Sequence, residues 1–302
     1  MRKSLALQAE MAEEFGTCVF DVTLDCEDGA PVGGEAEHAA LVTELALAAA
    51  PQARVAVRVH PVDHPAFGAD VATIAGRAGH RLVHLMVPKV ESVADVQLAA
   101  RTLDAAGATG LPLHVLIESP AAVHRAFDIA EHPRVQSISF GLMDFVSAHG
   151  GAIPADGMSA AGQFTHPLVV RAKLEIASAC HAHGKVPSHC VVTEFKNLDA
   201  LQHAARQASR ELGYTRMWSI HPDQIRPILA AFAPSEREVE TAAALIERAM
   251  AADWAPVQFE GRLHDRASYR YFWQVLERAH QTGLPLPAVV QACFSDAVAL
   301  RH

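Results

Sequence analysis

Residues 113–141 read LHVLIESPAAVHRAFDIAEHPRVQSISFG, and this stretch decides the fold. Residues 113–118, LHVLIE, are a nearly continuous apolar run, which is typical of a parallel strand that helices cover on its faces. Residues 135–141 at the other end, VQSISFG, are interpreted as a second strand. Residues 120–131 between them have the pattern of a helix. A strand, a helix and a second strand in this order predict one unit of a parallel sheet.

The same alternation continues in both directions along the chain. It predicts seven strands, over residues 17–24, 54–60, 82–89, 113–118, 135–141, 185–192 and 216–220. It predicts helices between them, over residues 34–50, 65–78, 90–106, 120–131, 167–183 and 198–212. Gly107, Gly184 and Gly213 stand where the C-caps of three of these helices are expected.

The number of strands and the start of the chain favour a barrel. Only seven strands are visible, and the chain opens with a helical pattern over residues 2–15 rather than with a strand. A (β/α)₈ TIM barrel whose first strand is missing or irregular accounts for both facts. An open doubly wound sheet usually carries a glycine-rich phosphate turn. The nearest candidate for such a turn, residues 29–34, lacks the GxGxxG spacing, so we expect an α/β barrel.

The pattern changes after Pro234, which suggests a second region. We expect residues 1–234 to form the barrel domain and residues 235–302 to form a C-terminal helical extension. This extension begins with a helix over residues 235–252, whose Ser235–Glu238 start resembles a capping box. It continues with an extended stretch over 255–265, a helix over 269–282 and a last helix after Pro287. Such an extension could cover the barrel mouth, reach a neighbouring subunit or simply pack against the barrel.

Composition excludes several classes of protein. The chain has 302 residues, 50% of them apolar, and a formal net charge of −9. A net-negative chain without a run of lysine and arginine argues against a nucleic-acid or anionic-membrane partner. No apolar run reaches the length of about 18 residues that a membrane-spanning helix needs. The five cysteines are odd in number and lack CxxC spacing, which predicts the cytoplasm rather than an oxidising compartment.

Polar residues occupy the carboxyl ends of the predicted strands, where the active sites of such barrels lie. Glu118 and Asp144 follow two neighbouring strands, which are about 4.8 Å apart in a sheet, so both carboxylates can reach one cation. Two oxygen ligands without a thiolate or a histidine suit Mg²⁺. The alternative is that each residue caps the helix that follows it. Gly141 and Met143 border Asp144 and are expected to contact the substrate.

Two basic residues belong to the same set of strand ends. Arg58 is flanked by valines, and a buried arginine needs an anion, such as the carboxylate of a substrate. An ion pair with Glu27 or Asp28 is the alternative, and the two interpretations are compatible. Lys89 could be a Schiff-base lysine. However, the proline before it and the helix start after it favour a structural role at the rim.

Six segments in register resemble the HpcH/HpaI aldolase and citrate lyase β-subunit superfamily, in its citrate-lyase-like branch. They are DVTLDCEDGAP, VAVRVHP, LMVPKVES, HVLIESPAAV, ISFGLMDF and WSIHPDQIRPILAAFAPS, between about residues 17 and 235. The later segment VQFEGRLHD, which ends at Asp265, is similar to the C-terminal segment of that family. The resemblance implies a (β/α)₈ barrel that assembles as a homotrimer or hexamer, with the tail near a subunit interface.

The resemblance also implies roles for particular residues. Glu118 and Asp144 match the glutamate and aspartate that bind Mg²⁺, and Arg58 matches the arginine that holds the keto-acid product. Glu27 and Asp28 match the acids that support this arginine and the waters of the metal. The tail residue Asp265 matches an aspartate that exchanges a proton with the substrate carbon, often across the subunit interface.

The implied activity is the magnesium-dependent cleavage of a carbon–carbon bond. The substrate would be a 3-hydroxyacyl thioester, possibly of CoA, or a hydroxy acid, and the products an acetyl moiety and an α-keto acid such as oxaloacetate or glyoxylate. Two alternatives remain. One is a class II pyruvate-type aldolase that acts on free hydroxy-keto acids, and the other is a non-catalytic member that binds a keto acid.

Overall fold

The computed structural model describes residues 1–30 and 32–299, which divide into two compact units. The first unit contains residues 1–9 and 20–232, and the second contains residues 10–19 and the chain from Ala233 onward. Pro31, in the glycine-rich stretch 29–34, and residues 300–302 of the expected extension lie outside the described residues.

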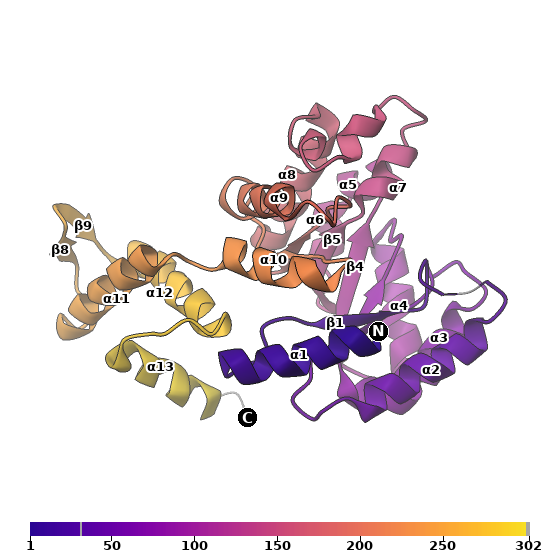
Figure 1. The fold of residues 1–302 in the computed structure, drawn as a ribbon, viewed down its shortest axis with the longest axis horizontal. Coiled ribbons are helices and arrows are strands. Elements are labelled where there is room, and N and C mark those ends of the chain that lie inside the picture. The colour runs from indigo at the N-terminus through magenta and orange to yellow at the C-terminus, as the bar shows by residue number, and fades with distance from the viewer. Residues whose placement is uncertain (31, 300–302) are drawn as a thin grey trace. The chain divides into compact units, whose positions relative to one another are not determined.

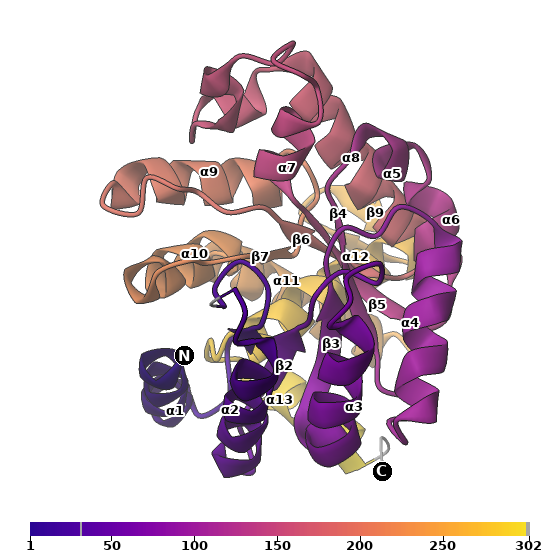
Figure 2. The same cartoon turned by 90° about the vertical axis from the view of Figure 1, so that its right-hand side faces the viewer.

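The first unit is built on a parallel sheet of seven strands. The strands lie in sequence order, each hydrogen-bonded to the next, and their bounds are β1 (Val22–Asp25), β2 (Val55–Arg58), β3 (Leu82–Val87), β4 (Leu113–Ile117), β5 (Val135–Phe140), β6 (Val186–His189) and β7 (Arg216–Met217). The sheet is curled, and helices surround its outer face (Figure 2). The α/β barrel architecture expected from the sequence is therefore confirmed, in a form with seven strands.

The helices of this unit follow the predicted alternation, and Figure 1 labels them along the chain. Their bounds are α1 (Arg2–Phe15, which continues into the second unit), α2 (Glu35–Ala48), α3 (Phe67–Ala78), α4 (Val93–Ala105), α5 (Pro120–His124), α6 (Ala126–Glu131), α7 (Leu142–Ser147), α8 (Pro167–Ala182), α9 (Leu198–Arg210) and α10 (Ile225–Phe232). Four short 3₁₀ turns complete the unit, at Gly79–Arg81, Ala155–Met158, Gly162–Phe164 and Pro222–Gln224.

Local differences from the predicted elements are small. The helix expected over 120–131 is broken at Arg125 into α5 and α6, and residues 17–21 are not part of β1. The short helix α7 contains Asp144, where a helix was expected only as the alternative to a metal ligand and without bounds. The helix α10 follows the last strand of the sheet, where the sequence His221–Pro222 predicts the start of a helix. Gly107, Gly184 and Gly213 have φ values of 81°, 65° and 75°, as the predicted C-cap positions require.

The main apolar core lies between the sheet and the helices that cover it. Leu24, Val57, Leu85, Val115 and Ile138 are fully buried strand residues of this core, which they share with buried residues of α2, α3, α4, α6 and α8. Side chains alternate between the two faces of a strand. The residues between these apolar ones therefore face the inside of the curled sheet.

The inside of the curled sheet is polar near the amino ends of the strands. Asp21, just before β1, lies 2.6 Å from Nε of Arg54 and 3.5 Å from Nη2 of Arg216, the first residue of β7. The contact with Arg216 links the two edge strands of the described sheet. His84 and His114 are also buried there, with ring centroids 5.1 Å apart. Burial lowers the pKa of His84 to about 4 and that of His114 well below its ordinary value.

We expect the buried histidines to make the fold less stable as the pH falls. His84, His114 and His189 have depressed pKa values in the folded protein, whereas in the unfolded chain each pKa is about 6.5. Between about pH 6.5 and 4 the unfolded chain therefore binds more protons, so each histidine lowers the free energy of unfolding by up to about 1.4 kcal/mol per pH unit. Urea unfolding at pH 7, 6 and 5 measures this slope.

A histidine variant provides the control for this prediction. His84→Gln keeps a polar side chain that does not titrate, so its unfolding midpoint should change less between pH 7 and 5 than that of the unmodified protein. An identical slope in the two proteins would show that His84 does not contribute.

The second unit has its own small core. Its elements after Ala233 are α11 (Glu236–Ala251), the antiparallel strands β8 (Val257–Phe259) and β9 (Arg262–His264), α12 (Arg266–Gln281) and α13 (Ala288–Ala299). Buried residues of the three helices form one apolar cluster. The predicted capping box at Ser235 is present. The stretch expected to be extended over 255–265 is a hairpin, which turns where Glu260 and Gly261 both have positive φ.

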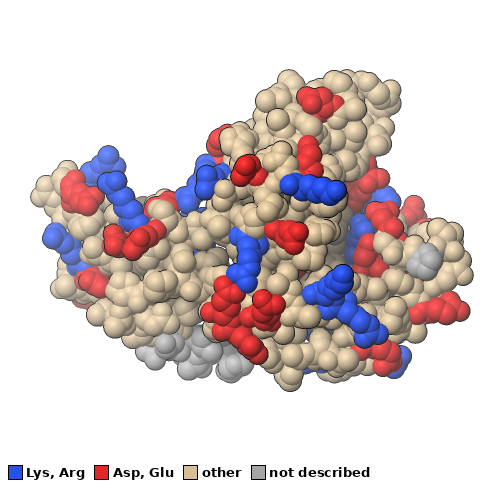
Figure 3. All heavy atoms as spheres, in the orientation of Figure 1, with Lys and Arg blue, Asp and Glu red and all other residues tan. Residues whose placement is uncertain are grey.

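The surface shows no large region of one charge in the view of Figure 3, where the basic and acidic side chains of the described residues are interspersed. Among the described helices, none has the length and apolar character needed to cross a bilayer.

Candidate active site

Arg58, the last residue of β2, lies at the centre of a network of charged side chains. Asp25, the last residue of β1, is its partner in the register of the two parallel strands. Nε and Nη2 of Arg58 donate to the two carboxylate oxygens of Asp25, at 2.7 and 2.6 Å. The fork of the guanidinium is thus matched to one carboxylate, which is its strongest mode of pairing.

The remaining terminal nitrogen of Arg58 faces two more acids. Nη1 lies 2.7 Å from Oε2 of Glu27 and 3.4 Å from Oδ2 of Asp28. The ring of Trp218, just after β7, lies 5.3 Å from the guanidinium carbon. Only 11% of the Arg58 side chain is exposed. Burial opposes its charge, but the surrounding carboxylates raise the pKa of Arg58 further, so the guanidinium is a fixed cation.

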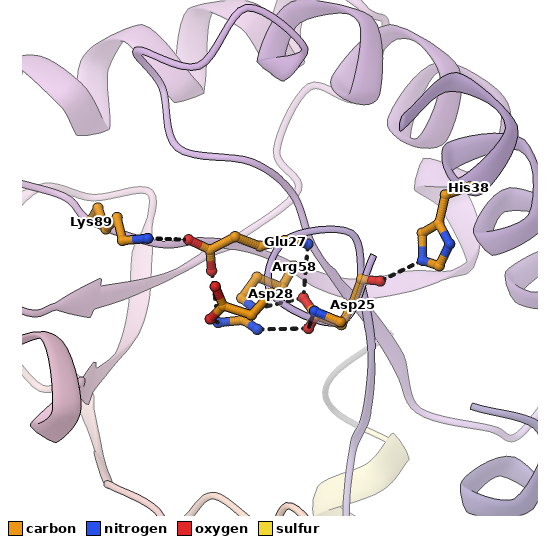
Figure 4. Close-up of polar contacts among 7 residues, drawn as sticks. Asp25, Glu27, Asp28, His38, Arg58 and Lys89 are labelled. Atoms are coloured by element: carbon orange, nitrogen blue, oxygen red, sulfur yellow. Dashed lines mark hydrogen bonds and ion pairs between the residues drawn. The ribbon is translucent and has the colours of Figure 1, made fainter. Parts of the chain in front are cut away.

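The turn after β1 holds Asp25 in place. The amides of Glu27 and Gly29 donate to its two carboxylate oxygens, at 3.0 and 2.9 Å. Nε2 of His38 bonds to its carbonyl oxygen at 2.7 Å (Figure 4). Burial alone would raise the pKa of Asp25, but the hydrogen bonds from Arg58 and the two amides outweigh it and lower the pKa. The carboxylate is therefore ionised and immobile.

Lys89 reaches the same network from the end of β3. Its Nζ lies 2.7 Å from Oε1 of Glu27, so Glu27 is shared between Lys89 and Arg58 (Figure 4). Burial opposes the charge of Lys89, but Glu27 raises its pKa above the ordinary value. The pKa of Glu27 is raised, because only 7% of its side chain is exposed and burial outweighs the two cations.

Glu118 and Asp144 form a second group of carboxylates at this rim. Glu118 follows β4 and is buried, whereas Asp144 lies in the first turn of α7, after β5, and is exposed. Burial, Asp144 and Glu27 raise the pKa of Glu118 to about 8, while Lys89 and its backbone amide act in the opposite direction. Among the residues that the structure describes, neither carboxylate of this pair forms an ion pair.

These two carboxylates fit a hard divalent cation. A buried carboxylate beside a second one is costly unless a cation neutralises both. The described residues contain no group of three or more histidine, cysteine or acidic side chains that could hold a metal on its own. Two carboxylates that leave the other positions to water and substrate match the way Mg²⁺ is usually bound. Acids outnumber cations at the described rim, where Asp25, Glu27, Asp28, Glu118 and Asp144 accompany Arg58 and Lys89.

Gly141 provides the space that Glu118 occupies. A Cβ at position 141 would lie 2.5 Å from Cγ and 2.8 Å from Cδ of Glu118. The φ of Gly141 is −91°, so its backbone suits any residue and only the close approach requires glycine. Met143, two residues further along and half-buried, stands between Gly141 and Asp144 in the sequence.

We expect Gly141→Ala to displace Glu118 and to weaken Mg²⁺ binding by about tenfold or more, as changes next to a metal ligand generally do. Calorimetric titration with MgCl₂ measures the affinity, and circular dichroism checks the fold. Gly68→Ala is the matched control, because a Cβ at position 68 has no atom within 4 Å and its addition should leave the affinity unchanged. Equal Mg²⁺ affinity in Gly141→Ala and the unmodified protein would contradict this account of the site.

The structure brings together most of the residues selected from the sequence, and it adds others. Arg58, Glu27, Asp28, Glu118 and Asp144 all lie at the carboxyl ends of β1 to β5. Asp265 belongs to the second unit, where it caps α12 by accepting hydrogen bonds from the amides of Ala267 and Ser268.

Sequence reasoning missed three contributors to the network. They are Asp25 as the main partner of Arg58, Trp218 over the guanidinium, and His38 behind the turn. Asp25 could have been identified from its position, since it ends β1 and Arg58 ends the neighbouring strand β2. No sequence pattern identifies Trp218 or His38, because their contacts depend on how the sheet curls and on where α2 begins.

Comparison with known proteins identifies relatives of this chain. The model of the HpcH/HpaI aldolase/citrate lyase family matches residues 4–222. L-malyl-CoA/beta-methylmalyl-CoA lyase of Cereibacter sphaeroides is 31% identical over 278 residues, which are 85% of this chain and 86% of that protein.

Two solved structures are also similar. A citrate lyase from Burkholderia xenovorans has 48% identity and a TM-score of 0.81, over 96% of this chain and 91% of that one. CitE from Mycobacterium tuberculosis, in complex with magnesium and pyruvate, has 25% identity and a TM-score of 0.60, over 77% of this chain and 87% of that one.

Proposed function

The chain belongs to the HpcH/HpaI aldolase/citrate lyase family and is an enzyme of the lyase class; from this premise we propose that it catalyses a magnesium-dependent carbon–carbon cleavage. The proposed substrate is a 3-hydroxyacyl thioester, with CoA as the favoured carrier, or the corresponding hydroxy acid. The products are an acetyl moiety and an α-keto acid, either oxaloacetate or glyoxylate. The observation that carries the proposal is that Arg58, held by Asp25 and Glu27, lies at the same rim as Glu118 and Asp144, which form no ion pair among the described residues.

Glu118 and Asp144 are the proposed ligands of Mg²⁺. Their oxygens are the ligand type that this ion prefers, and a cation there would remove the cost of burying Glu118 next to other carboxylates. When bound, Mg²⁺ supplies Lewis acidity to the oxygens of the hydroxy acid. The similar CitE protein, described with magnesium and pyruvate, supports this choice of ion and of ligand class.

Arg58 is proposed to bind the carboxylate of the keto acid. Asp25 holds its Nε and Nη2, and Glu27 holds its Nη1, so the guanidinium is oriented before the substrate arrives. The contact with Asp28 is the weakest, at 3.4 Å to a side chain that is 70% exposed. We propose that the substrate carboxylate takes the place of Asp28 at this edge of Arg58, while Gly141 and Met143 line the same pocket.

Proton transfer completes the reaction. The hydroxyl proton passes to water, and the electron pair of the O–H bond forms the carbonyl group of the keto acid. The bond between the hydroxyl carbon and the acetyl carbon breaks, and the acetyl carbon keeps its electron pair and gains a proton. We propose Asp265 as the group that gives this proton, and takes it back in the reverse direction. Asp265 lies in the extension 235–302, which we propose acts as a lid over the barrel mouth of a neighbouring subunit in a homotrimer or hexamer. No disulfide joins the five cysteines, all of which lie among the described residues, and this favours the cytoplasm as the compartment.

The test is an assay with matched substrates. The purified protein is incubated with malyl-CoA, citryl-CoA and the free acids malate and citrate, each with Mg²⁺ and with EDTA. Glyoxylate or oxaloacetate is detected as its phenylhydrazone, and acetyl-CoA by chromatography. We expect cleavage of a thioester with Mg²⁺ only. Cleavage of none of the four by folded protein would count against the proposal, and cleavage of a free acid alone would replace the thioester with a free-acid substrate.

A further inference from the structure

Lys89 has a backbone conformation that L residues rarely adopt. Its φ is +51°, and among the described residues of the first unit it is the only non-glycine residue with a positive φ. A glycine would take this conformation without strain. Strain of this kind persists at positions where the side chain and the backbone together serve a function. The turn after β3 therefore needs both the unusual backbone and the lysine side chain.

The turn after β3 directs the side chain of Lys89 to the arginine network. Its Nζ lies 2.7 Å from Oε1 of Glu27, which follows β1. Glu118 and Asp144, which follow β4 and β5, also raise the pKa of Lys89, although among the described residues it forms an ion pair with neither. The ammonium is therefore paired with the arginine network rather than with the carboxylate pair.

Glu27 depends on Lys89 for half of its contacts. Its carboxylate is almost completely removed from solvent, and its oxygens meet one cation each, Lys89 at 2.7 Å and Arg58 at 2.7 Å (Figure 4). Without the ammonium, one oxygen of a buried carboxylate loses its partner, which costs free energy unless the side chain turns away. A turn of Glu27 would release Nη1 of Arg58, so the orientation of the guanidinium depends on Lys89.

We propose that Lys89 is a positioning residue, which holds Arg58 for the keto-acid carboxylate through Glu27. The inference rests on the proposed function and deepens it, because it assigns a residue to the orientation of the guanidinium that binds the substrate. It also replaces the two sequence interpretations of Lys89. An ammonium engaged with a buried carboxylate is not a nucleophile for a Schiff base, and a residue that orients Arg58 is more than a rim support.

Two variants test the role of the ammonium. Lys89→Gly removes the ammonium and keeps the left-handed backbone, which glycine favours. Lys89→Arg keeps a cation at the end of the side chain. Arg77→Met is the control for loss of a charge, since Arg77 forms an ion pair with Glu44 that is exposed on both sides.

The readouts are calorimetric titrations with MgCl₂ alone and with oxaloacetate and glyoxylate at saturating Mg²⁺. For Lys89→Gly we expect a Kd for Mg²⁺ within about twofold of the unmodified value and a Kd for the keto acid about tenfold higher, the usual effect of losing a charged hydrogen bond. Lys89→Arg should restore most of the keto-acid affinity, and Arg77→Met should change nothing.

Two results would contradict the proposal. Unchanged keto-acid affinity in Lys89→Gly would overturn the role of the ammonium. A Kd for Mg²⁺ that rises as much as the Kd for the keto acid would overturn a role that is specific to Arg58. Failure of the unmodified protein to bind either keto acid would instead reject the proposed function. Unfolding midpoints from circular dichroism identify a variant that does not fold, and Lys89→Gly is expected to be at least as stable as the unmodified protein.

Discussion

Glu118→Gln is expected to weaken Mg²⁺ binding by at least about 100-fold, the upper range for changes at a metal site, and to abolish Mg²⁺-dependent cleavage. Glutamine has the shape of glutamate but lacks the charge, so one of the two carboxylates proposed to hold the cation is lost. Burial and the neighbouring carboxylates of Asp144 and Glu27 raise the pKa of Glu118, so in the metal-free protein its negative charge is unfavourable and a neutral amide of the same shape is tolerated there. The substitution should therefore leave the free energy of unfolding almost unchanged.

A loss of Mg²⁺ affinity with an unchanged free energy of unfolding distinguishes a lost metal ligand from a damaged fold. Titration with MgCl₂ measures the affinity, and urea unfolding in EDTA measures the free energy of unfolding. Glu44→Gln is the control, because Glu44 is exposed and its loss should alter neither quantity. A Glu118→Gln protein that binds Mg²⁺ with unchanged affinity would remove Glu118 from the metal site.

Arg58→Lys is expected to reduce the rate of cleavage by about 100- to 1000-fold, by analogy with the loss of one oxyanion-hole donor. A lysine carries the charge but not the fork, so it cannot bond both oxygens of Asp25, Glu27 and a substrate carboxylate together. The keto-acid affinity at saturating Mg²⁺ should fall with the rate. Mg²⁺ affinity should change much less, because the described contacts of Arg58 are with Asp25, Glu27 and Asp28 rather than with the carboxylate pair.

Arg77→Lys is the matched control for this substitution, since it makes the same chemical change in an exposed ion pair. Keto-acid titrations of the two variants and the unmodified protein are compared at one Mg²⁺ concentration. Keto-acid affinity in Arg58→Lys equal to that of the unmodified protein would contradict the role proposed for the guanidinium.

The barrel could be predicted from the sequence because its strands are short apolar runs that alternate with helical patterns. The parallel order places all strand ends at one edge of the sheet, so Glu118, Asp144 and Arg58 could be grouped from the sequence alone. The bounds of the short helix α7 could not be predicted, because its six residues are too few for a periodic pattern to be visible.

The contacts within the site were harder to predict than its members. The pairing of Asp25 with Arg58 follows from the register of β1 and β2, which no sequence pattern specifies to one residue. The role proposed for Lys89 depends on a positive φ, which is not expected of a lysine and is therefore invisible in the sequence. The close approach of Gly141 to Glu118 likewise depends on the packing of β5 against β4.

The most direct test of the central claim is calorimetric titration of the unmodified protein with oxaloacetate and with glyoxylate, each with and without Mg²⁺. The account predicts that one of these acids binds and that its binding requires Mg²⁺, which would join Arg58, Glu118 and Asp144 in one working site. The account would be contradicted if the folded protein bound neither acid, or if it bound an acid equally well in EDTA.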